Sequence, residues 1–352
     1  MDHSRQTVNI SMLSHQYIDR HTQQVRDERL YADRVVSALY SPALEKAAFL
    51  TRVASSHWIS NGLATLNYST LGSQVTGMVR FLGQSGVDLS ECVEAPEHFA
   101  TIREIFERKI RYWDCRPMSA DSSVAVCPAD SRAIVGSLRE TSALFIKEKF
   151  FDFRELVSTD REQWCEAFSD GDFAIFRLTP EKYHYVHVPE SGIVEDFYEI
   201  RGRYHSCNPG AVISLANPHS KNRRVVTILQ TDVDGGDGLG LIAIIEVVAL
   251  MVGQIEQCYS SDRYDEPQTI KRGMFLRRGQ PKSLFRPGSS TVILLFQKGR
   301  IKFAADLVSN RFRADARSRF SLGLNQTIVE TDVAVRSPLA TATVRGKEVK
   351  DE

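Results

Sequence analysis

The stretch that decides the fold is residues 285–296, which read Phe-Arg-Pro-Gly-Ser-Ser-Thr-Val-Ile-Leu-Leu-Phe. Its second half is a run of apolar and β-branched residues, and the turn residues Pro287 and Gly288 precede that run. A short run of this kind, bounded by turn residues, predicts a buried strand. Further runs of the same type occur at residues 173–176, 225–229 and 241–245. We therefore predict a strand-rich region that begins near residue 124.

The N-terminal part has a different pattern. Residues 24–113 carry apolar side chains at helical spacing, most clearly Ile102, Ile105, Phe106, Ile110 and Trp113. We interpret this stripe as a helix face that packs on the core, with a basic amphipathic helix on a membrane surface as the alternative. A helical region 1–117, a strand-rich catalytic region 118–340 and a charged tail 341–352 together predict an α+β fold.

The composition is that of an ordinary globular protein. The chain has 352 residues, of which 42% are hydrophobic and 25% charged. Lys plus Arg and Asp plus Glu both number 44, so the formal net charge is zero and argues against a nucleic-acid partner. The longest apolar run, residues 239–253, is too short to span a bilayer and contains Glu246. With no apolar signal segment in residues 1–20, we expect an intracellular protein, cytoplasmic or peripherally bound to a membrane.

Neither of two candidate metal patterns holds. The six cysteines include no Cys-x-x-Cys pair, so we expect buried thiols rather than a zinc site or a disulfide framework. Residues 232–238 look like a calcium loop, but Asp237 and Ala243 stand where such a loop needs Gly and Glu. A tight turn between two strands explains the glycines. No metal is expected.

Three local features could carry chemistry. They are Asp130 in Cys-Pro-Ala-Asp, the pair His184 and His187, and Ser290 in Gly-Ser-Ser-Thr. Each alone has a structural explanation: the Asp could close a turn, the histidines could be structural or half of a metal site, and the serines could form a turn. Together, an Asp, a His and a Ser can form a triad in which the carboxylate orients the imidazole and the imidazole takes the hydroxyl proton.

These features resemble the motifs of the phosphatidylserine decarboxylase family. That family typically shows Pro-Ala-Asp-Gly, then Leu-Ser-Pro-x-Asp-Tyr-His-x-x-His-x-Pro-x-x-Gly, then Gly-Ser-Thr or Gly-Gly-Ser-Thr before an apolar strand. The corresponding segments here are residues 128–131, 178–192 and 288–291, in the same order. The third segment fits the Gly-Gly-Ser-Thr branch, and the likeness covers roughly residues 100–335.

The resemblance implies a proenzyme that cleaves itself. Asp130 would orient His187, and His187 would draw the proton from Ser290. The Ser290 oxygen would then attack the carbonyl carbon of Ser289 and turn the peptide bond into an ester. Elimination and hydrolysis would break the chain between residues 289 and 290 and leave a pyruvoyl group on residue 290. Ser289 is the alternative nucleophile.

The pyruvoyl group would be the only cofactor, and it would serve as the electron sink for decarboxylation. His184, the other histidine of the family motif, would reprotonate the product carbon. Side chains three apart on a strand point to opposite faces, so both histidines could share a site only from a turn or a helical segment. Residues 179–181, Thr-Pro-Glu, are compatible with the start of a helix.

Several positions depart from the family pattern without removing a proposed catalytic group. Ser131, Ser289 and Val248 stand in place of glycines, Glu148 occupies another common glycine position, and Arg223 replaces a Glu. The glycine losses matter only where the backbone needs a positive φ. The Arg223 change inverts a charge, so it bears more on the substrate than on the decarboxylation.

The resemblance leaves three functions to weigh. The first is decarboxylation of phosphatidylserine to phosphatidylethanolamine, with bilayer contact through the helix predicted at 102–113. The second is decarboxylation of a free amino acid, such as an aromatic one. The third is a non-catalytic binding protein, which the retained Asp, His and Ser residues disfavour. In the first two, the two cleaved chains are expected to stay together, and a homodimer is a further expectation.

Overall fold

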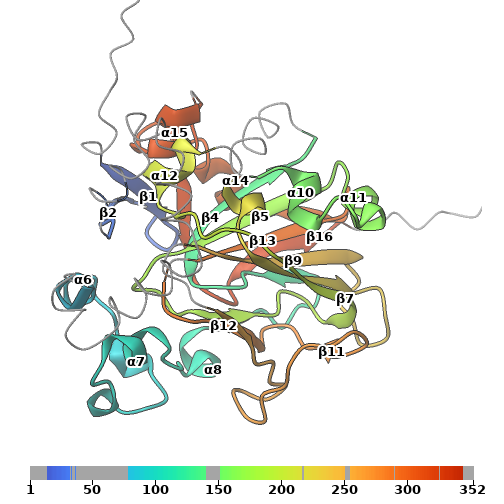
Figure 1. Cartoon of the computed structure of the whole chain (residues 1–352), viewed down its shortest axis with the longest axis horizontal. Helices are drawn as coiled ribbons and strands as arrows, with labels where there is room; N and C mark the ends of the chain where they lie inside the picture. The colour runs from blue at the N-terminus through green and yellow to red at the C-terminus, as the bar shows by residue number, and fades with distance from the viewer. Residues whose placement is uncertain are drawn as a thin grey trace, which may run out of the picture.

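The computed structural model of this chain describes residues 14–31, 33, 36, 78–139, 151–215, 218–249, 254–288, 290–324 and 326–343. Within these ranges the molecule has three layers. A broad sheet forms the middle, helices lie on one side of it, and shorter strands lie on the other (Figure 1).

The middle layer is a ten-stranded sheet with the order β11-β7-β8-β9-β13-β5-β4-β15-β1-β2. All neighbouring strands are antiparallel except β1 and β15, which are parallel. The strand bounds are β1 His15–Asp19, β2 Val25–Glu28, β4 Ser131–Ser137, β5 Asp172–Leu178, β7 Gly192–Ile200, β8 Arg224–Gln230, β9 Leu241–Val248, β11 Phe275–Leu276, β13 Ser290–Phe296 and β15 Glu330–Val333.

Strand β13 lies inside this sheet and is buried on both faces. Side chains alternate along a strand, so Val292, Leu294 and Phe296 enter one core while Ile293 and Leu295 enter the other. A strand covered on both faces needs apolar residues at every position, which is why the run after Ser290 is continuously hydrophobic.

Two three-stranded sheets cover one face of the large sheet. The first, which we call the β12 sheet, has the order β10-β12-β6, and the second, the β16 sheet, has the order β14-β16-β3. Both contribute to the core that contains Val292 and Leu294. Their bounds are β3 Val124–Val126, β6 Tyr185–His187, β10 Ile255–Gln257, β12 Pro281–Phe285, β14 Ile301–Phe303 and β16 Pro338–Ala342.

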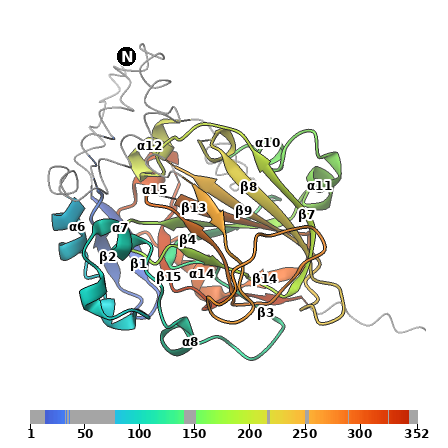
Figure 2. The same ribbon diagram turned by 60° about the horizontal axis from the view of Figure 1, so that its bottom comes forward.

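Short helices cover the opposite face and one end. Side chains of α10, α11, α12 and α15 share a core with Ile293 and Leu295, and α6 and α7 lie beside β1 and β2 in both views (Figures 1 and 2). The helix bounds are α6 Met78–Gln84, η2 Leu89–Glu91, η3 Pro96–His98, α7 Ile102–Phe106, α8 Tyr112–Cys115, α10 Phe153–Val157, α11 Glu162–Ala167, α12 Pro209–Ser214, α13 Pro218–Lys221, α14 Ala305–Asn310 and α15 Arg319–Leu324.

The predicted α+β class and the predicted strands are confirmed. The runs at 173–176, 225–229 and 241–245 fall in β5, β8 and β9, and residues 232–238 connect β8 to β9 as the predicted turn. The end of the long apolar run, residues 250–253, lies outside the described residues, as do Glu148 and residues 344–352 of the tail. The part of the tail at 341–342 belongs to β16.

The prediction of helix from residue 24 is wrong for residues 25–28, which form β2. Strand β2 pairs with β1, and β1 pairs with β15, so a tertiary strand pairing overrides the local helical pattern. This pairing also ties the N-terminal segment to the large sheet. The domain boundary at residue 117 stays a prediction.

The single helix predicted over residues 102–113 is two short helices. Helix α7 stops because Ile110 forms a bridge with Cys92 and the Arg111 N–H donates to the Glu91 carbonyl, so these backbone groups leave the helical ladder. Ile102, Phe106 and Ile110 are buried, as the packing interpretation of the stripe predicts. No helix in the described part of the chain is long and apolar enough to cross a membrane.

Candidate active site

Ser290 is the first residue of β13, where it lies between two neighbouring strands. Its register partners are Leu178 at the end of β5 and Val248 at the end of β9. The side chain is fully buried, and its hydroxyl oxygen meets no hydrogen-bond partner in the described part of the chain. A buried hydroxyl without a partner is costly, which is the usual sign of a functional or strained group. Ser289, the alternative nucleophile, lies outside the described residues.

The chain bends just before this serine. Gly288 has φ of 143°, in a region that residues with a side chain rarely adopt. The glycine of the motif is therefore required by the backbone conformation two residues before Ser290.

His187 ends strand β6, and its ring is held on both sides. Its backbone N–H donates to the Pro128 carbonyl at 2.7 Å, which places it beside the Pro-Ala-Asp motif. Ring atom Nδ1 lies 2.9 Å from the Gly279 carbonyl oxygen. Since a carbonyl only accepts, Nδ1 carries the proton and Nε2 is the acceptor for the Tyr183 hydroxyl at 2.8 Å. Burial is the main reason that the pKa of His187 falls to about 3, so the ring is neutral at pH 7.

The Tyr183 hydroxyl has a second phenolic neighbour. It lies 2.8 Å from the hydroxyl of Tyr264, which donates to the Ile110 carbonyl at 2.9 Å. The ring of Tyr112 meets the His187 ring edge-on at 4.8 Å between centroids. This aromatic surround fixes the orientation of His187, and sequence reasoning missed it, although the tyrosine directly precedes His184 in the motif.

His184 lies just before β6 in a separate environment. Its ring stacks on Phe106 of α7 with centroids 3.5 Å apart, and its Nδ1 atom meets no hydrogen-bond partner in the described ranges. Burial, followed by the nearby Arg108 charge, lowers the pKa of His184 to about 3. Of the turn and the helical segment left open for this stretch, the turn is present: the Lys182 N–H bonds to the Thr179 carbonyl just before β6.

Asp130 is bound to an arginine instead of to a histidine. Arg116 donates to its two carboxylate oxygens at 3.1 and 2.9 Å, and the Val335 N–H donates at 2.7 Å. Burial would raise the pKa of Asp130, but the Arg116 charge outweighs it and holds that pKa below its usual value. The expected hydrogen bond from Asp130 to His187 is therefore absent from the contacts of the described residues, because both ring nitrogens of His187 have other partners.

The structure does not bring Ser290 and His187 into contact either. Ser290 points to the face of the large sheet that carries Val292, whereas β6 directs Val186 to that core and Tyr185 and His187 away from it. Val186 and His187 point in opposite directions because side chains alternate along β6. Of the predicted residues, His187 is tied to the segment of Asp130 through the Pro128 backbone contact, and no hydrogen bond among the described residues joins either of them to His184 or Ser290.

A pocket lies at the end of β5. Its cavity volume is about 40 Å³, far smaller than that of an ordinary small-molecule site. Its lining includes Leu178, the register partner of Ser290, and also Arg29, Tyr31, Arg177 and Asn208. The pocket thus adjoins the end of the strand that pairs with Ser290.

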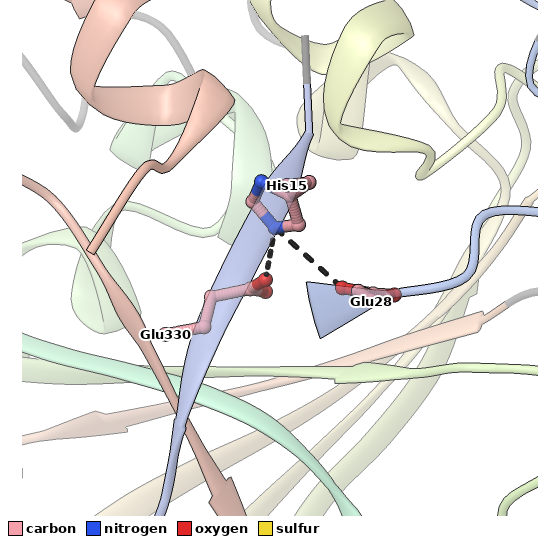
Figure 3. Close-up of side chains that lie close together, drawn as sticks. All are labelled: His15, Glu28 and Glu330. Carbon is pink, nitrogen blue, oxygen red and sulfur yellow. Dashed lines mark hydrogen bonds and ion pairs between the residues drawn. The ribbon is translucent and has the colours of Figure 1, made fainter. Parts of the chain in front are cut away.

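A buried ion-pair network forms one wall of this pocket, and sequence reasoning missed it. Arg177 donates to Glu28 and to Glu330, with Nη2 at 2.6 Å from an oxygen of each. His15 lies 2.9 Å from Glu330 and 3.6 Å from Glu28 (Figure 3). His15, Glu28 and Glu330 are residue types that can bind a metal ion, and their ligand atoms lie close together. The Arg177 guanidinium already binds both carboxylates, so the cluster is a salt-bridge network.

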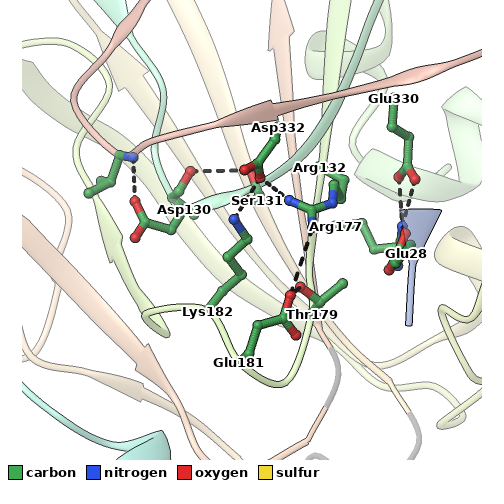
Figure 4. Close-up of polar contacts among 12 residues, drawn as sticks. Glu28, Asp130, Ser131, Arg132, Arg177, Thr179, Glu181, Lys182, Glu330 and Asp332 are labelled. Atoms are coloured by element: carbon green, nitrogen blue, oxygen red, sulfur yellow. Dashed lines mark hydrogen bonds and ion pairs between the residues drawn. The ribbon is translucent and has the colours of Figure 1, made fainter. Parts of the chain in front are cut away.

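A second polar group continues from this network toward Asp130 (Figure 4). Asp332 accepts from Lys182 at 2.6 Å and from Arg132, whose guanidinium also covers the Tyr17 ring at 3.5 Å. Thr179 and Glu181 join the group from the loop after β5. Its residues come from β1, β4, β15 and the His motif, so the network braces the loop that carries both histidines.

The sequence comparisons point to one family. The family model described as phosphatidylserine decarboxylase matches residues 102–320. Proenzyme 2 of this type from Oryza sativa subsp. japonica is 34% identical over 232 residues, which are 65% of this chain and 34% of that protein. The chain thus aligns with only about a third of the rice protein.

Bacterial relatives are covered more fully. The phosphatidylserine decarboxylase proenzyme of Photobacterium profundum is 33% identical over 245 residues, 66% of this chain and 81% of that protein. That of Clostridium tetani is 26% identical over 294 residues, 83% of this chain and 91% of that protein. The match includes Asp130, both motif histidines and Ser290 within residues 102–320. This chain belongs to the phosphatidylserine decarboxylase family of carboxy-lyases.

Proposed function

We propose that this protein cleaves itself between residues 289 and 290, forms a pyruvoyl group from Ser290 and decarboxylates phosphatidylserine to phosphatidylethanolamine. The observation that carries the proposal is the buried hydroxyl of Ser290 at the start of β13, two residues after the bend at Gly288, with no hydrogen-bond partner among the residues that the structure describes. Membership of a family whose curated relatives are named proenzymes supports self-processing.

The residues around Ser290 fit formation of the group from the chain. Attack on the preceding carbonyl requires a sharp bend, and Gly288 supplies one two residues earlier. Strand β13 is hydrogen-bonded to β5 and β9, which anchors the part of the chain that follows the scissile bond. The pyruvoyl group, once formed there, would supply the electron sink for loss of CO2.

His187 is proposed as the base that takes the Ser290 proton. Its neutral ring has an acceptor nitrogen, which is the form this step needs. In the uncleaved chain Tyr183 occupies that nitrogen, so the step requires the 286–289 connection to bring Ser290 to His187. Asp130 would hold His187 in place indirectly. Its contacts with Arg116 and Val335 anchor the segment in which the Pro128 carbonyl accepts from the His187 backbone N–H.

His184 is proposed to deliver the proton to the product carbon. Its ring is neutral, and its Nδ1 atom has no hydrogen-bond partner among the described residues. Stacking on Phe106 fixes the plane of the ring. Because a neutral imidazole has no readily released proton, His184 must first accept one from water at Nδ1, and the fixed ring plane then directs its delivery to the substrate carbon.

The two cleaved chains are proposed to remain together. Cleavage would give residues 1–289 and 290–352, and the second fragment contains β13, β14, β15 and β16. Strand β13 pairs with β5 and β9 of the first fragment, and β15 pairs with β1 and β4. Separation would break these ladders and expose both cores, so a stable two-chain unit is expected. A homodimer of such units is part of the proposal.

The substrate is proposed to enter the pocket beside Leu178. Phosphatidylserine requires contact with a bilayer, and peripheral attachment on the cytoplasmic side is the arrangement we propose. Ile102 and Phe106 of α7 are buried, so we propose that this contact uses another surface. Decarboxylation of a free aromatic amino acid is the alternative.

The test has two steps. A denaturing gel of the purified wild-type chain should show two fragments, whereas Ser290→Ala should stay intact and Ser289→Ala should still cleave. An intact wild-type chain would contradict the mechanism, and loss of cleavage only in Ser289→Ala would move the reaction to that residue. CO2 release is then measured with phosphatidylserine vesicles and with free aromatic amino acids. Release from the amino acids alone would replace the lipid with the alternative substrate.

A further inference from the structure

A fully buried ion pair joins the large sheet to the β12 sheet. The Nζ atom of Lys282 on β12 lies 2.7 Å from Oε2 of Glu246 on β9, and both side chains are 0% exposed. Moving two charges out of water costs several kcal/mol per ion unless geometry and further hydrogen bonds compensate. Such a pair is therefore an expensive feature, and neither residue belongs to the motifs described above.

Two neutral side chains complete the arrangement. Lys282 also donates to Gln257 Oε1 at 2.9 Å, and Gln257 Nε2 donates to Glu246 Oε2 at 3.0 Å. The hydroxyl of Ser283 donates to Glu246 Oε1. Both carboxylate oxygens of Glu246 thus have donors from β10 and β12, and the four side chains form a closed network.

An irregularity in β12 makes this network possible. In a regular strand, neighbouring side chains point to opposite faces, so only one of Lys282 and Ser283 could reach Glu246. The register of β12 against β6 shifts between Pro281 and Ser283. Bulges of this kind redirect a side chain, and here both consecutive residues reach the same carboxylate.

The network lies close to the predicted cleavage site along both strands. Glu246 on β9 is the register partner of Val292 on β13. Val292 follows Ser290 by two residues, so both side chains lie on the same face of β13. On the other side, β12 ends at Phe285, and residues 286–289 connect it to Ser290. Figure 1 shows β12 below β9 and β13. The ion pair therefore links β12, which precedes the scissile bond in the chain, to β9, which pairs with β13 after that bond.

We propose that Glu246 and Lys282 are positioning residues for self-cleavage: their ion pair fixes the distance between β12 and the sheet that carries Ser290. The inference rests on the proposed self-cleavage. After the bond breaks, the same pair holds the end of the first fragment against the sheet that contains the second. Neither side chain touches the reacting atoms, so the effect is geometric. A displacement of about 1 Å at a reacting centre can cost roughly 100-fold in rate.

The experiment compares cleavage rate with stability. Glu246→Leu/Lys282→Met replaces the pair with apolar side chains of similar size, a change that often leaves stability unchanged or higher. Melting temperatures are measured in the Ser290→Ala background, where every chain stays intact. Cleavage is followed in the Ser290 background by denaturing gel after rapid purification. Asp315→Asn, which removes an exposed ion pair with Arg313, is the matched control.

We expect the double variant to melt near the parent and to cleave about 10- to 100-fold more slowly, while Asp315→Asn cleaves at the wild-type rate. A folded double variant with wild-type cleavage would overturn the inference. If the double variant does not fold, Glu246→Asp decides, because it keeps the charge and only withdraws the carboxylate. Slower cleavage with a preserved melting temperature supports positioning, and unchanged cleavage overturns it. A wild-type chain that never cleaves overturns the proposed function and this inference together.

Discussion

The hydroxyl of Tyr183 lies 2.8 Å from Nε2 of His187, and the Gly279 carbonyl oxygen lies 2.9 Å from Nδ1 of the same ring. Together the two contacts set the tautomer: Nδ1 carries the proton and Nε2 accepts. His187 is thus held ready as a base, with a tyrosine on the nitrogen that the proposed reaction uses.

The first prediction concerns this tyrosine. Tyr183→Phe leaves Nε2 of His187 buried without a donor, which should cost about 1–3 kcal/mol of stability and loosen the ring. We expect slower self-cleavage on a denaturing gel and a lower melting temperature. Tyr185→Phe is the control, since Tyr185 stacks on Tyr183 at 5.4 Å without contacting His187 through its hydroxyl. Equal cleavage rates in both variants would mean that the hydroxyl contact has no role.

The second prediction concerns the charge on Asp130. Although burial opposes ionisation, Arg116 keeps the pKa of Asp130 below its ordinary value in the folded chain. Its contribution to stability is therefore present above the unfolded pKa of about 4 and is lost as the pH falls through the lower folded value. Asp130→Asn should lower stability by roughly 3 kcal/mol at pH 7.

The pH dependence provides the check on this prediction. The deficit of Asp130→Asn in chemical denaturation should shrink as the pH is lowered below about 4, because the wild-type carboxyl then becomes neutral too. Glu91→Gln is the control, because Glu91 is the other carboxylate bound to Arg116 and its side chain is 29% exposed. This variant should lose about 1 kcal/mol of stability or less. A deficit that stays constant with pH would show that charge is not its cause.

The third prediction concerns Glu190, in the loop after His187. Its side chain is fully buried, and both carboxyl oxygens lack a hydrogen-bond donor in the part of the chain described. Burial, and next the neighbouring Asp237, raise the pKa of Glu190 to about 10. A group with a raised pKa stabilises fully below its unfolded pKa of about 4, and this contribution is lost as the pH rises toward 10.

Glu190→Gln should therefore be more stable than the parent at pH 8, by at least about 1 kcal/mol or about 2–4 °C in melting temperature. The gain should disappear near pH 4, where the parent carboxyl is neutral in both states. Glu195→Gln, at a side chain that is 43% exposed, should show neither effect. An identical gain at both pH values would point to packing instead of titration.

The strands could be predicted from the sequence because their signal is local. The run after Ser290 is hydrophobic at every position since β13 is covered on both faces. The pairing of β1 with β15 joins residues about 315 positions apart, as the contact between His15 and Glu330 shows. No local pattern indicates such a pairing, so β2 was predicted as helix.

The motif residues could be found from the sequence, but their partners could not. Asp130 was expected beside His187 because triads are built that way, yet its side-chain donor is Arg116. Likewise, Glu246 interrupts an apolar run in the sequence. Only the packing of β12 on β9 brings its partner Lys282 to it.

The fourth prediction concerns metal binding at His15, Glu28 and Glu330. Arg177 contacts both carboxylates at 2.6 Å, so an ion would have to displace a guanidinium. Zinc and chelator should both leave the melting temperature of the parent unchanged. Arg177→Ala leaves two buried carboxylates unpaired and should be less stable by several kcal/mol. Zinc should recover part of that loss, since the three side chains then form a ligand set. A zinc-dependent rise in the parent would show that Arg177 does not close the site.

The fifth prediction concerns the bend before the cleavage site. Gly288 has φ of 143°, where a Cβ atom is strained. Gly288→Ala should cost roughly 1–3 kcal/mol if the backbone keeps this conformation. Alternatively, the chain relaxes and displaces the carbonyl of residue 289 from Ser290. Melting temperature in the Ser290→Ala background measures the first effect, and the cleavage rate with Ser290 present measures the second. Gly273→Ala, at a positive φ of 84° in open space far along the chain from the bond, controls for strain alone. If Gly288→Ala loses stability like this control but cleaves normally, the bend serves the fold and not the reaction.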